Sequence, residues 1–186
     1  MNIEQDNTIR LQRDVEANIV PSGDKVTLAA GNLVRVTQSL GGNHTIIING
    51  NMAQISAENA DALGLEIEKS DIDGSTNQFS EQLVWDQLKT CYDPEIPVNI
   101  VELGLIYDLS IEQGENGNNV SIKMTLTAPG CGMGPVIADE VDRKINALQD
   151  VESVNVELVW EPQWNQGMMS EAVSYTHLTL PTNREV

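Results

Sequence analysis

The residues with the clearest chemical potential lie in a glycine-rich segment, residues 127–135, with the sequence TAPGCGMGP. Cys131 is the one thiol of this segment, and Gly130 and Gly132 flank it directly. A cysteine thiolate binds metals and attacks electrophiles, and glycines allow a ligand or a partner backbone to come close. The plainer interpretation is a small apolar residue that fills a tight turn, which is the more common role of a cysteine.

The elements on either side of this segment determine where the thiol lies. Alternating apolar and polar residues predict a strand at Val120–Leu126. Pro135 suits the first position of a helix, and apolar residues recur at helical spacing from Ile137 to Leu148. Cys131 is therefore expected between a strand and a helix. Free N–H groups and the positive end of a helix dipole in that position favour the thiolate.

A second segment carries two carboxylates, Asp93 and Glu95. It follows a helix predicted over Ser80–Thr90, with Ser80 as its cap. Pro94 and Pro97 prevent continuation of the helix and stiffen the loop. Asp-Pro is a common turn starter whose carboxylate bonds its own backbone. The same pair of carboxylates could instead ligate a metal or set the protonation of a nearby thiol, and spacing alone leaves both alternatives open.

Three runs of sequence together resemble the domain found in SufT and PaaD, whose members are auxiliary factors in the maturation of iron–sulfur proteins. The runs are YDPEIPVNIVELGLIY at residues 92–107, MTLT followed by PGC within residues 124–131, and VELVWEPQW at residues 156–164. The similarity extends over residues 80–171. Residues 21–65 also resemble the extra N-terminal region of the SufT subgroup, which makes SufT a better match than the shorter PaaD proteins.

The resemblance implies that Cys131 is the functional thiol and that the Asp-Pro-Glu loop approaches it, since both loops leave the same end of the sheet. The residues predicted for the site are two metal ligands, Cys131 and Glu95, and four binding residues, Asp93, Thr127, Gly130 and Gly132. Asp93 is expected to brace its loop through backbone bonds, and Thr127 to bond the thiolate or a ligand.

The rhythm of the sequence divides the chain into five parts. Residues 1–18 are polar and lack a strong core pattern. Residues 19–66 carry short apolar runs separated by turns and predict a small β-meander or barrel-like unit. Residues 67–78 are typical of a linker. Residues 79–172 predict the iron–sulfur assembly-type domain. Residues 173–186 match nothing in the family and resemble a translated vector remnant, so they are treated as a non-native tail.

The predicted fold class is α+β: a two-layer α-β-β-α-β domain, with two helices on one face of a three-stranded sheet, preceded by the small all-β unit. A β unit of under fifty residues rarely stabilises itself, so it is expected to dock on the second domain or on a partner. Trp160 and Trp164, after the last strand, are expected to pack as a lid on the core.

Composition excludes several function classes. The chain has 186 residues and a net charge of −18, which argues against nucleic-acid binding because such proteins need basic patches. No GxxxxGK[ST] loop for nucleotide hydrolysis is present. The N-terminus does not resemble a signal peptide and no run reaches membrane-spanning length, so no membrane partner is expected. Two cysteines are too few for a disulfide framework, and the cytoplasm is the expected compartment.

The number of thiols ranks the remaining functions. An iron–sulfur cluster normally takes four protein ligands, mostly thiolates, so a monomer with two cysteines cannot enclose one alone. The leading hypothesis is an auxiliary factor in iron–sulfur cluster assembly that assists cluster transfer to client proteins, or their maturation, through Cys131. Its cofactor would be a transient iron–sulfur cluster or iron, with Glu95 or a second subunit of a homodimer completing the coordination.

The expected partners are iron–sulfur scaffold or carrier proteins and apo client proteins. The alternative is a protein-interaction adaptor that docks assembly components without binding metal. An enzyme is not expected, because nucleophilic cysteine catalysis needs a nearby base, usually histidine. The two histidines lie in an N-terminal loop, at His44, and in the tail, at His177.

Overall fold

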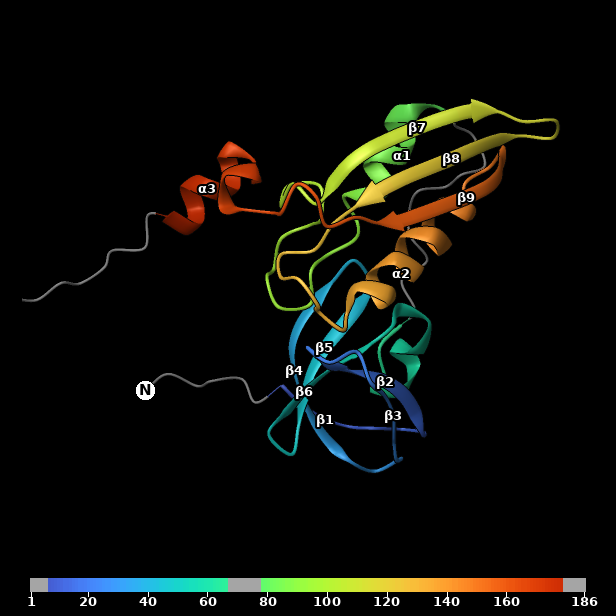
Figure 1. Cartoon of the computed structure of the whole chain (residues 1–186). Coiled ribbons are helices and arrows are strands. Elements are labelled where there is room, and N and C mark those ends of the chain that lie inside the picture. Colours follow the sequence, from blue (N-terminus) through green and yellow to red (C-terminus); the bar gives the residue numbers. More distant parts are fainter. Residues whose placement is uncertain (1–6, 67–77, 179–186) are drawn as a thin grey trace, which may run out of the picture.

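Two β-sheets, each with its own hydrophobic core, organise the chain (Figure 1). The computed structural model describes residues 7–66 and 78–178. Residues 67–77 of the predicted linker and the last eight residues of the predicted tail therefore lie outside the described residues. The first sheet belongs to the β unit, residues 8–63, and the second to the α+β unit, residues 81–158.

The β unit is a six-stranded antiparallel sheet with the strand order β1-β4-β5-β6-β2-β3. Its strands are β1 (Thr8–Arg10), β2 (Val15–Val20), β3 (Lys25–Leu28), β4 (Leu33–Leu40), β5 (Asn43–Ile48) and β6 (Asn51–Ile55). A 3-10 helix, η1 (Ala57–Leu63), follows the last strand.

This sheet begins at Thr8, earlier than the boundary at residue 19 that the sequence suggested. Leu11, Val15 and Ala17 are buried in its core, although they belong to the segment interpreted as polar. A strand with one face in solvent must alternate its buried residues with polar ones such as Glu16, which is exposed. Because the three buried residues are spread over a mostly polar segment, the sequence pattern did not indicate β2.

The α+β unit has the predicted element order, and the α+β fold class is confirmed. Its elements are α1 (Glu81–Leu88), β7 (Ile106–Gln113), β8 (Asn118–Met124), α2 (Gly134–Asn146) and β9 (Val151–Leu158). β8 pairs antiparallel with β7 and parallel with β9. The parallel pairing requires a crossover, and α2 supplies it. Figure 1 shows α1 and α2 on the same face of the sheet, and α2 packs on β9.

Local sequence explains why these helices form where they do. The hydroxyl of Ser80 accepts a hydrogen bond from the backbone N–H of Leu83 at 3.2 Å, the N-cap that the sequence predicted for α1. Pro135 lies in the first turn of α2. Ile137, Val141 and Ile145 recur at helical spacing along α2 and are buried in the core.

The segment after β9 contains η2 (Gln166–Met168) and α3 (Glu171–Leu178). α3 continues to Leu178, past residue 173, where the sequence suggested that native structure ends. The indole N–H of Trp164 donates to the carbonyl oxygen of Leu103 at 2.8 Å, and Trp164 packs against the core. Trp160 is 44% exposed, so only one of the two tryptophans acts as the predicted lid.

Lys144 on α2 links the β unit to the α+β unit. Its ammonium donates to the carbonyl oxygens of Thr90, at 2.7 Å, and of Gly41 in the β4–β5 turn, at 3.1 Å. The same nitrogen lies 2.9 Å from Glu140 Oε1, as an ion pair without hydrogen-bond geometry. The other carboxylate oxygen of Glu140, a residue only 4% exposed, accepts from Asn43 Nδ2 at 2.7 Å. The two units are therefore joined by a partly buried polar network.

We expect Lys144→Met to lower the unfolding free energy by about 2–4 kcal/mol, because Glu140 loses its counter-charge while it stays buried. Arg143→Met is the matched control on the same helix. Arg143 pairs with Glu58 at the surface, and such pairs contribute no more than about 1 kcal/mol. Urea denaturation of both variants measures the difference, and equal losses would contradict the importance of the Lys144 network.

Candidate functional site

Cys131 lies on the loop that joins β8 to α2, here called the Cys131 loop (residues 125–133). Two consecutive turns shape it: the N–H of Cys131 donates to the carbonyl of Ala128 at 3.3 Å, and the N–H of Gly134 donates to the carbonyl of Cys131 at 3.2 Å. The thiol is partly exposed at the edge of the hydrophobic core. The sequence prediction of a thiol between strand and helix is thus observed in the fold.

The two glycines beside Cys131 serve different purposes. Gly130 has φ +75°, a left-handed conformation that favours glycine, and a Cβ there would meet nothing within 4 Å. A Cβ on Gly132, in contrast, would overlap the carbonyl oxygen of Ser22. The backbone that approaches Gly132 belongs to this chain's own β unit, whereas the sequence suggested a ligand or a partner.

The carboxylate of Asp93 stabilises its own loop, the Asp93 loop (residues 92–99). Asp93 Oδ1 accepts hydrogen bonds from the N–H groups of Glu95, at 2.8 Å, and Ile96, at 2.9 Å. The backbone N–H of Asp93 donates to the carbonyl of Val98 at 3.2 Å, and its side chain is buried. These bonds are the bracing role expected for Asp93. Glu95 is exposed on the same loop and free to contact a partner or a metal.

The Asp93 loop and the Cys131 loop leave the same end of the three-stranded sheet (Figure 1). Ile106, at the start of β7, pairs with Met124, at the end of β8, and the N–H of Thr125 donates to the carbonyl of Leu105 at 2.8 Å. Thr127 is half-buried within the Cys131 loop. The hydrogen bonds of Asp93 remain within its own loop, so the proximity of its carboxylate to the thiol stays a prediction.

The second thiol has a different environment. Cys91 is completely buried, and this burial, together with the nearby carboxylate of Glu140, raises the pKa of its thiol from 9.0 to about 12. It therefore stays protonated at neutral pH and out of reach of a metal, because only the thiolate is a ligand. Cys131 is the accessible thiol of the chain.

Within residues 7–66 and 78–178, no group of three or more histidine, cysteine, aspartate or glutamate side chains is arranged to hold a metal ion. Among the described residues, Cys131 therefore belongs to no such group.

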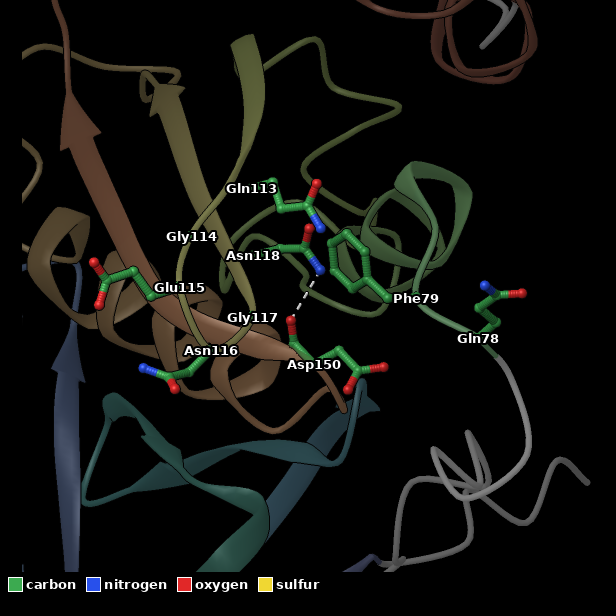
Figure 2. A pocket seen from close by; sticks show the side chains of 9 residues that line it. All are labelled: Gln78, Phe79, Gln113, Gly114, Glu115, Asn116, Gly117, Asn118 and Asp150. Carbon is green, nitrogen blue, oxygen red and sulfur yellow. Dashed lines mark hydrogen bonds between the residues drawn. The ribbon is translucent and has the colours of Figure 1, made fainter.

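A separate hollow of about 440 Å³ lies at the tip of the β7–β8 hairpin (Figure 2). Its lining is mostly polar: Gln78, Phe79, Gln113, Gly114, Glu115, Asn116, Gly117, Asn118 and Asp150. The amide of Asn118 donates to the backbone carbonyl of Asp150 at 2.9 Å, so part of this polar lining is already paired. It lies at the opposite end of the sheet from the Cys131 loop and contains no thiol or imidazole.

Comparison with known proteins finds similarity over the α+β unit. Residues 81–158 match the model of a family described as iron–sulfur cluster assembly protein. The chain is 43% identical over 97 residues to an Fe–S protein maturation auxiliary factor of Porphyromonas gingivalis, covering 51% of this chain and 90% of that protein. It is 37% identical over 78 residues to the Fe–S protein maturation auxiliary factor SufT of Staphylococcus aureus, covering 42% of this chain and 85% of that protein.

Among solved structures, a domain of unknown function from Bacillus anthracis is 33% identical, with a TM-score of 0.48, covering 53% of this chain and 92% of that one. This chain belongs to the family of iron–sulfur cluster assembly proteins. The resemblance to SufT-type factors that the three sequence runs suggested is confirmed.

The β unit lies outside the matched residues 81–158. The two relatives are covered over 90% and 85% of their length by 97 and 78 aligned residues, so neither has room for both units of this chain. The expectation that residues 21–65 reflect an extra region of the SufT subgroup therefore gains no support from the SufT of Staphylococcus aureus. Relative to these two proteins, the β unit is an addition.

Sequence reasoning missed the β2–β3 turn (residues 21–24) as part of this site. Cys131 Sγ lies 4.0 Å from the carbonyl oxygen of Pro21, a residue 110 positions away in the chain. The acceptor is a backbone oxygen, and a contact to the backbone of a distant residue leaves no pattern in residue types. The sequence predicted turns between the short strands of this unit and gave no sign of what they touch.

We expect Asp93→Ala to cost about 1–3 kcal/mol of unfolding free energy, because two backbone N–H groups lose their acceptor. Asp93→Asn keeps a side-chain oxygen at this position and should cost less. Glu95→Gln is the control, since an exposed side chain without such bonds should change stability by no more than about 0.5 kcal/mol. Urea unfolding of the three variants tests the ranking, and a fully stable Asp93→Ala protein would contradict the bracing role.

The raised pKa of Cys91 predicts a loss of stability in alkali. Between pH 9 and 12 the unfolded chain carries a Cys91 thiolate and the folded chain a thiol, so the folded state binds more protons and its stability falls as pH rises. The slope for this one group approaches about 1.4 kcal/mol per pH unit. Urea unfolding at pH 8.5, 9.5 and 10.5 should show a steeper decline for the wild type than for Cys91→Ala. Parallel declines would show that Cys91 does not titrate in this way.

Proposed function

We propose that this chain is an auxiliary factor that assists the maturation of iron–sulfur proteins by handling a cluster or iron through Cys131. The observation that supports it best is the contrast between its two thiols. Cys131 is accessible on a loop shaped by glycines, whereas Cys91 is sealed in the core with a pKa of about 12. One accessible thiol suits a protein that passes its cargo on.

In this proposal the cluster is a substrate held between proteins. Cys131 gives up its proton when its sulfur bonds to iron, since a metal ligand must be deprotonated. The remaining ligands come from a scaffold or carrier protein and then from the apo client, with Glu95 or a second copy of this chain able to fill a position. Transfer is ligand exchange: a client thiolate forms its bond to iron as the Cys131–iron bond breaks, and Cys131 takes up a proton again.

The Asp93 loop and Thr127 would shape the surface around the thiol. Asp93 keeps its loop in one conformation through its two N–H acceptors, so that Glu95 projects from a fixed position. Thr127 could donate its hydroxyl hydrogen to the thiolate or to a cluster sulfide. Gly130, where a Cβ would meet nothing within 4 Å, would leave the open side of the thiol to the cargo, whereas Gly132 faces the backbone of the β unit.

A second candidate function is an adaptor that docks assembly components without binding metal. The absence of a three-residue metal group from the described parts of the chain favours it. In this case Cys131 would organise a docking surface. We assign no catalytic residue under either hypothesis: the hydrogen-bond partner that the described residues offer Cys131 Sγ is the Pro21 carbonyl, which is not a base.

None of the helices within the described ranges, 7–66 and 78–178, combines the length and the apolar character needed to cross a membrane. We place the proposed work in a reducing compartment, the cytoplasm, because its working group is a free thiol.

Anaerobic reconstitution with iron and sulfide separates the two candidate functions. We expect the wild type and Cys91→Ala to bind iron and sulfide, and Cys131→Ala to lose at least about 90% of both, because one thiol holds the cargo. The far-UV circular dichroism of Cys131→Ala should match the wild type, since a partly exposed turn cysteine contributes modestly to packing.

Complementation in cells then tests the role itself. Iron–sulfur client enzymes should lose activity when the chain carries Cys131→Ala and keep it with Cys91→Ala. Loss of client activity in cells without loss of iron binding would favour the adaptor. Full client activity with Cys131→Ala would refute any role for this thiol.

A further inference from the structure

The β2–β3 turn of the β unit lies directly against the Cys131 loop. A Cβ on Gly23 would overlap the carbonyl oxygen of Gly132, and a Cβ on Gly132 would overlap the carbonyl oxygen of Ser22. Two glycines on opposite sides thus permit a close approach of backbone to backbone. The carbonyl oxygen of Pro21 lies 4.0 Å from Cys131 Sγ and is its hydrogen-bond acceptor.

Hydrogen bonds within the β2–β3 turn hold it in one conformation. The N–H of Gly23 donates to the carbonyl of Ile19 at 2.7 Å, and the N–H of Ile19 donates to the carbonyl of Asp24 at 2.8 Å. The hydroxyl of Ser22 donates to Asp24 Oδ2 at 2.7 Å. A turn closed in this way moves as one body, so a displacement at Gly23 also moves the carbonyl that faces the thiol.

The residue that leads into the turn is anchored in the other unit. Val20, the last residue of β2, is 7% exposed and belongs to the hydrophobic core of the α+β unit, together with residues of α1, β8 and α2. The Lys144 network fixes the β unit at a second place, through Gly41. The turn is therefore seated on the Cys131 loop by the docking of the whole β unit.

We propose that the β2–β3 turn is an intramolecular cover of Cys131, and that the docked β unit limits access to this thiol. A sulfur-to-metal bond is about 2.3 Å long, so a gap of 4.0 Å between Sγ and a carbonyl oxygen leaves no room for a metal ion with its other ligands. The side of the thiol that faces Pro21 is closed while the turn is seated. Cargo reaches Cys131 from the open side or after the turn moves away.

The two relatives described above are consistent with the β unit being an addition to the shared domain. The auxiliary factors of Porphyromonas gingivalis and Staphylococcus aureus have no room for a β unit beside the shared segment. In this chain the extra unit places its turn on the functional loop. The cover gives the β unit a role at the proposed site. The consequence of the cover for cluster handling rests on the proposed function, whereas the existence of the cover does not.

The test measures alkylation of Cys131 by iodoacetamide in the full chain without iron, followed by peptide mass spectrometry. Gly23→Ala forces the turn away from Gly132, and Gly31→Ala is the matched control. Gly31 lies in the same unit with φ +86°, but a Cβ there would meet nothing within 4 Å, so both variants carry the same backbone strain. We expect Gly23→Ala to be alkylated about fivefold faster or more, and Gly31→Ala to stay within about twofold of the wild type.

Cys91 reports unfolding in the same experiment, because it is fully buried in the native chain. Faster alkylation of Cys131 with Cys91 unmodified supports the cover, and an unchanged or slower rate in folded Gly23→Ala overturns it. Equal alkylation of both thiols in Gly23→Ala would mean that this variant unfolds. The alkylation rate of Cys131 in Lys144→Met then tests the cover, since this substitution weakens docking of the β unit at a distance from the thiol. A rate for Lys144→Met equal to that of Arg143→Met then overturns the proposal. Failure of iron binding by the wild type would overturn only the proposed function.

Discussion

The ammonium of Lys144 is the group on which the relation between the two units depends. It supplies the donor for two backbone carbonyls, one from each unit, and the counter-charge for the buried carboxylate of Glu140. Each of these acceptors would be costly to bury alone. Docking of the β unit therefore accompanies the pairing of all three acceptors with the Lys144 ammonium. The docked unit also places the β2–β3 turn on the Cys131 loop. The Lys144 network and the seated turn are two contacts of the same docked β unit.

The α+β unit fixes the other side of the site by sheet geometry. Because β7 and β8 are antiparallel, the loop that enters β7 and the loop that leaves β8 meet at one end of the sheet. The other neighbour of β8, β9, is parallel to it, so α2 must cross back over the sheet and begins at this same end. Strand order thus puts the Cys131 loop, the start of α2 and the segment that leads into β7 at one end of the sheet, whereas the proximity of the Asp93 carboxylate to the thiol stays a prediction.

Much of this fold could be predicted from local pattern. Ser80 as a cap, Pro135 in the first turn of α2 and the bracing carboxylate of Asp93 act over a few residues, so their types and spacing are visible in the sequence. The first two strands of the β unit were hidden because they contain few apolar residues in a row: exposed polar residues interrupt the buried ones. The contact between Gly23 and Gly132 could not be predicted, since backbone atoms make it across more than a hundred residues.

The difference between the two cysteines is the last consequence of the same packing. Cys91 ends the turn after α1, beneath the Lys144 network, where burial and the charge of Glu140 keep it protonated. Cys131 lies at the edge of the core, with one side toward solvent and the other toward Pro21. A chain with two equally exposed thiols could retain a metal more firmly. In the proposed function, sealing one thiol and half-covering the other leaves a single sulfur ligand for the cargo, fewer than the four protein ligands that a cluster normally takes.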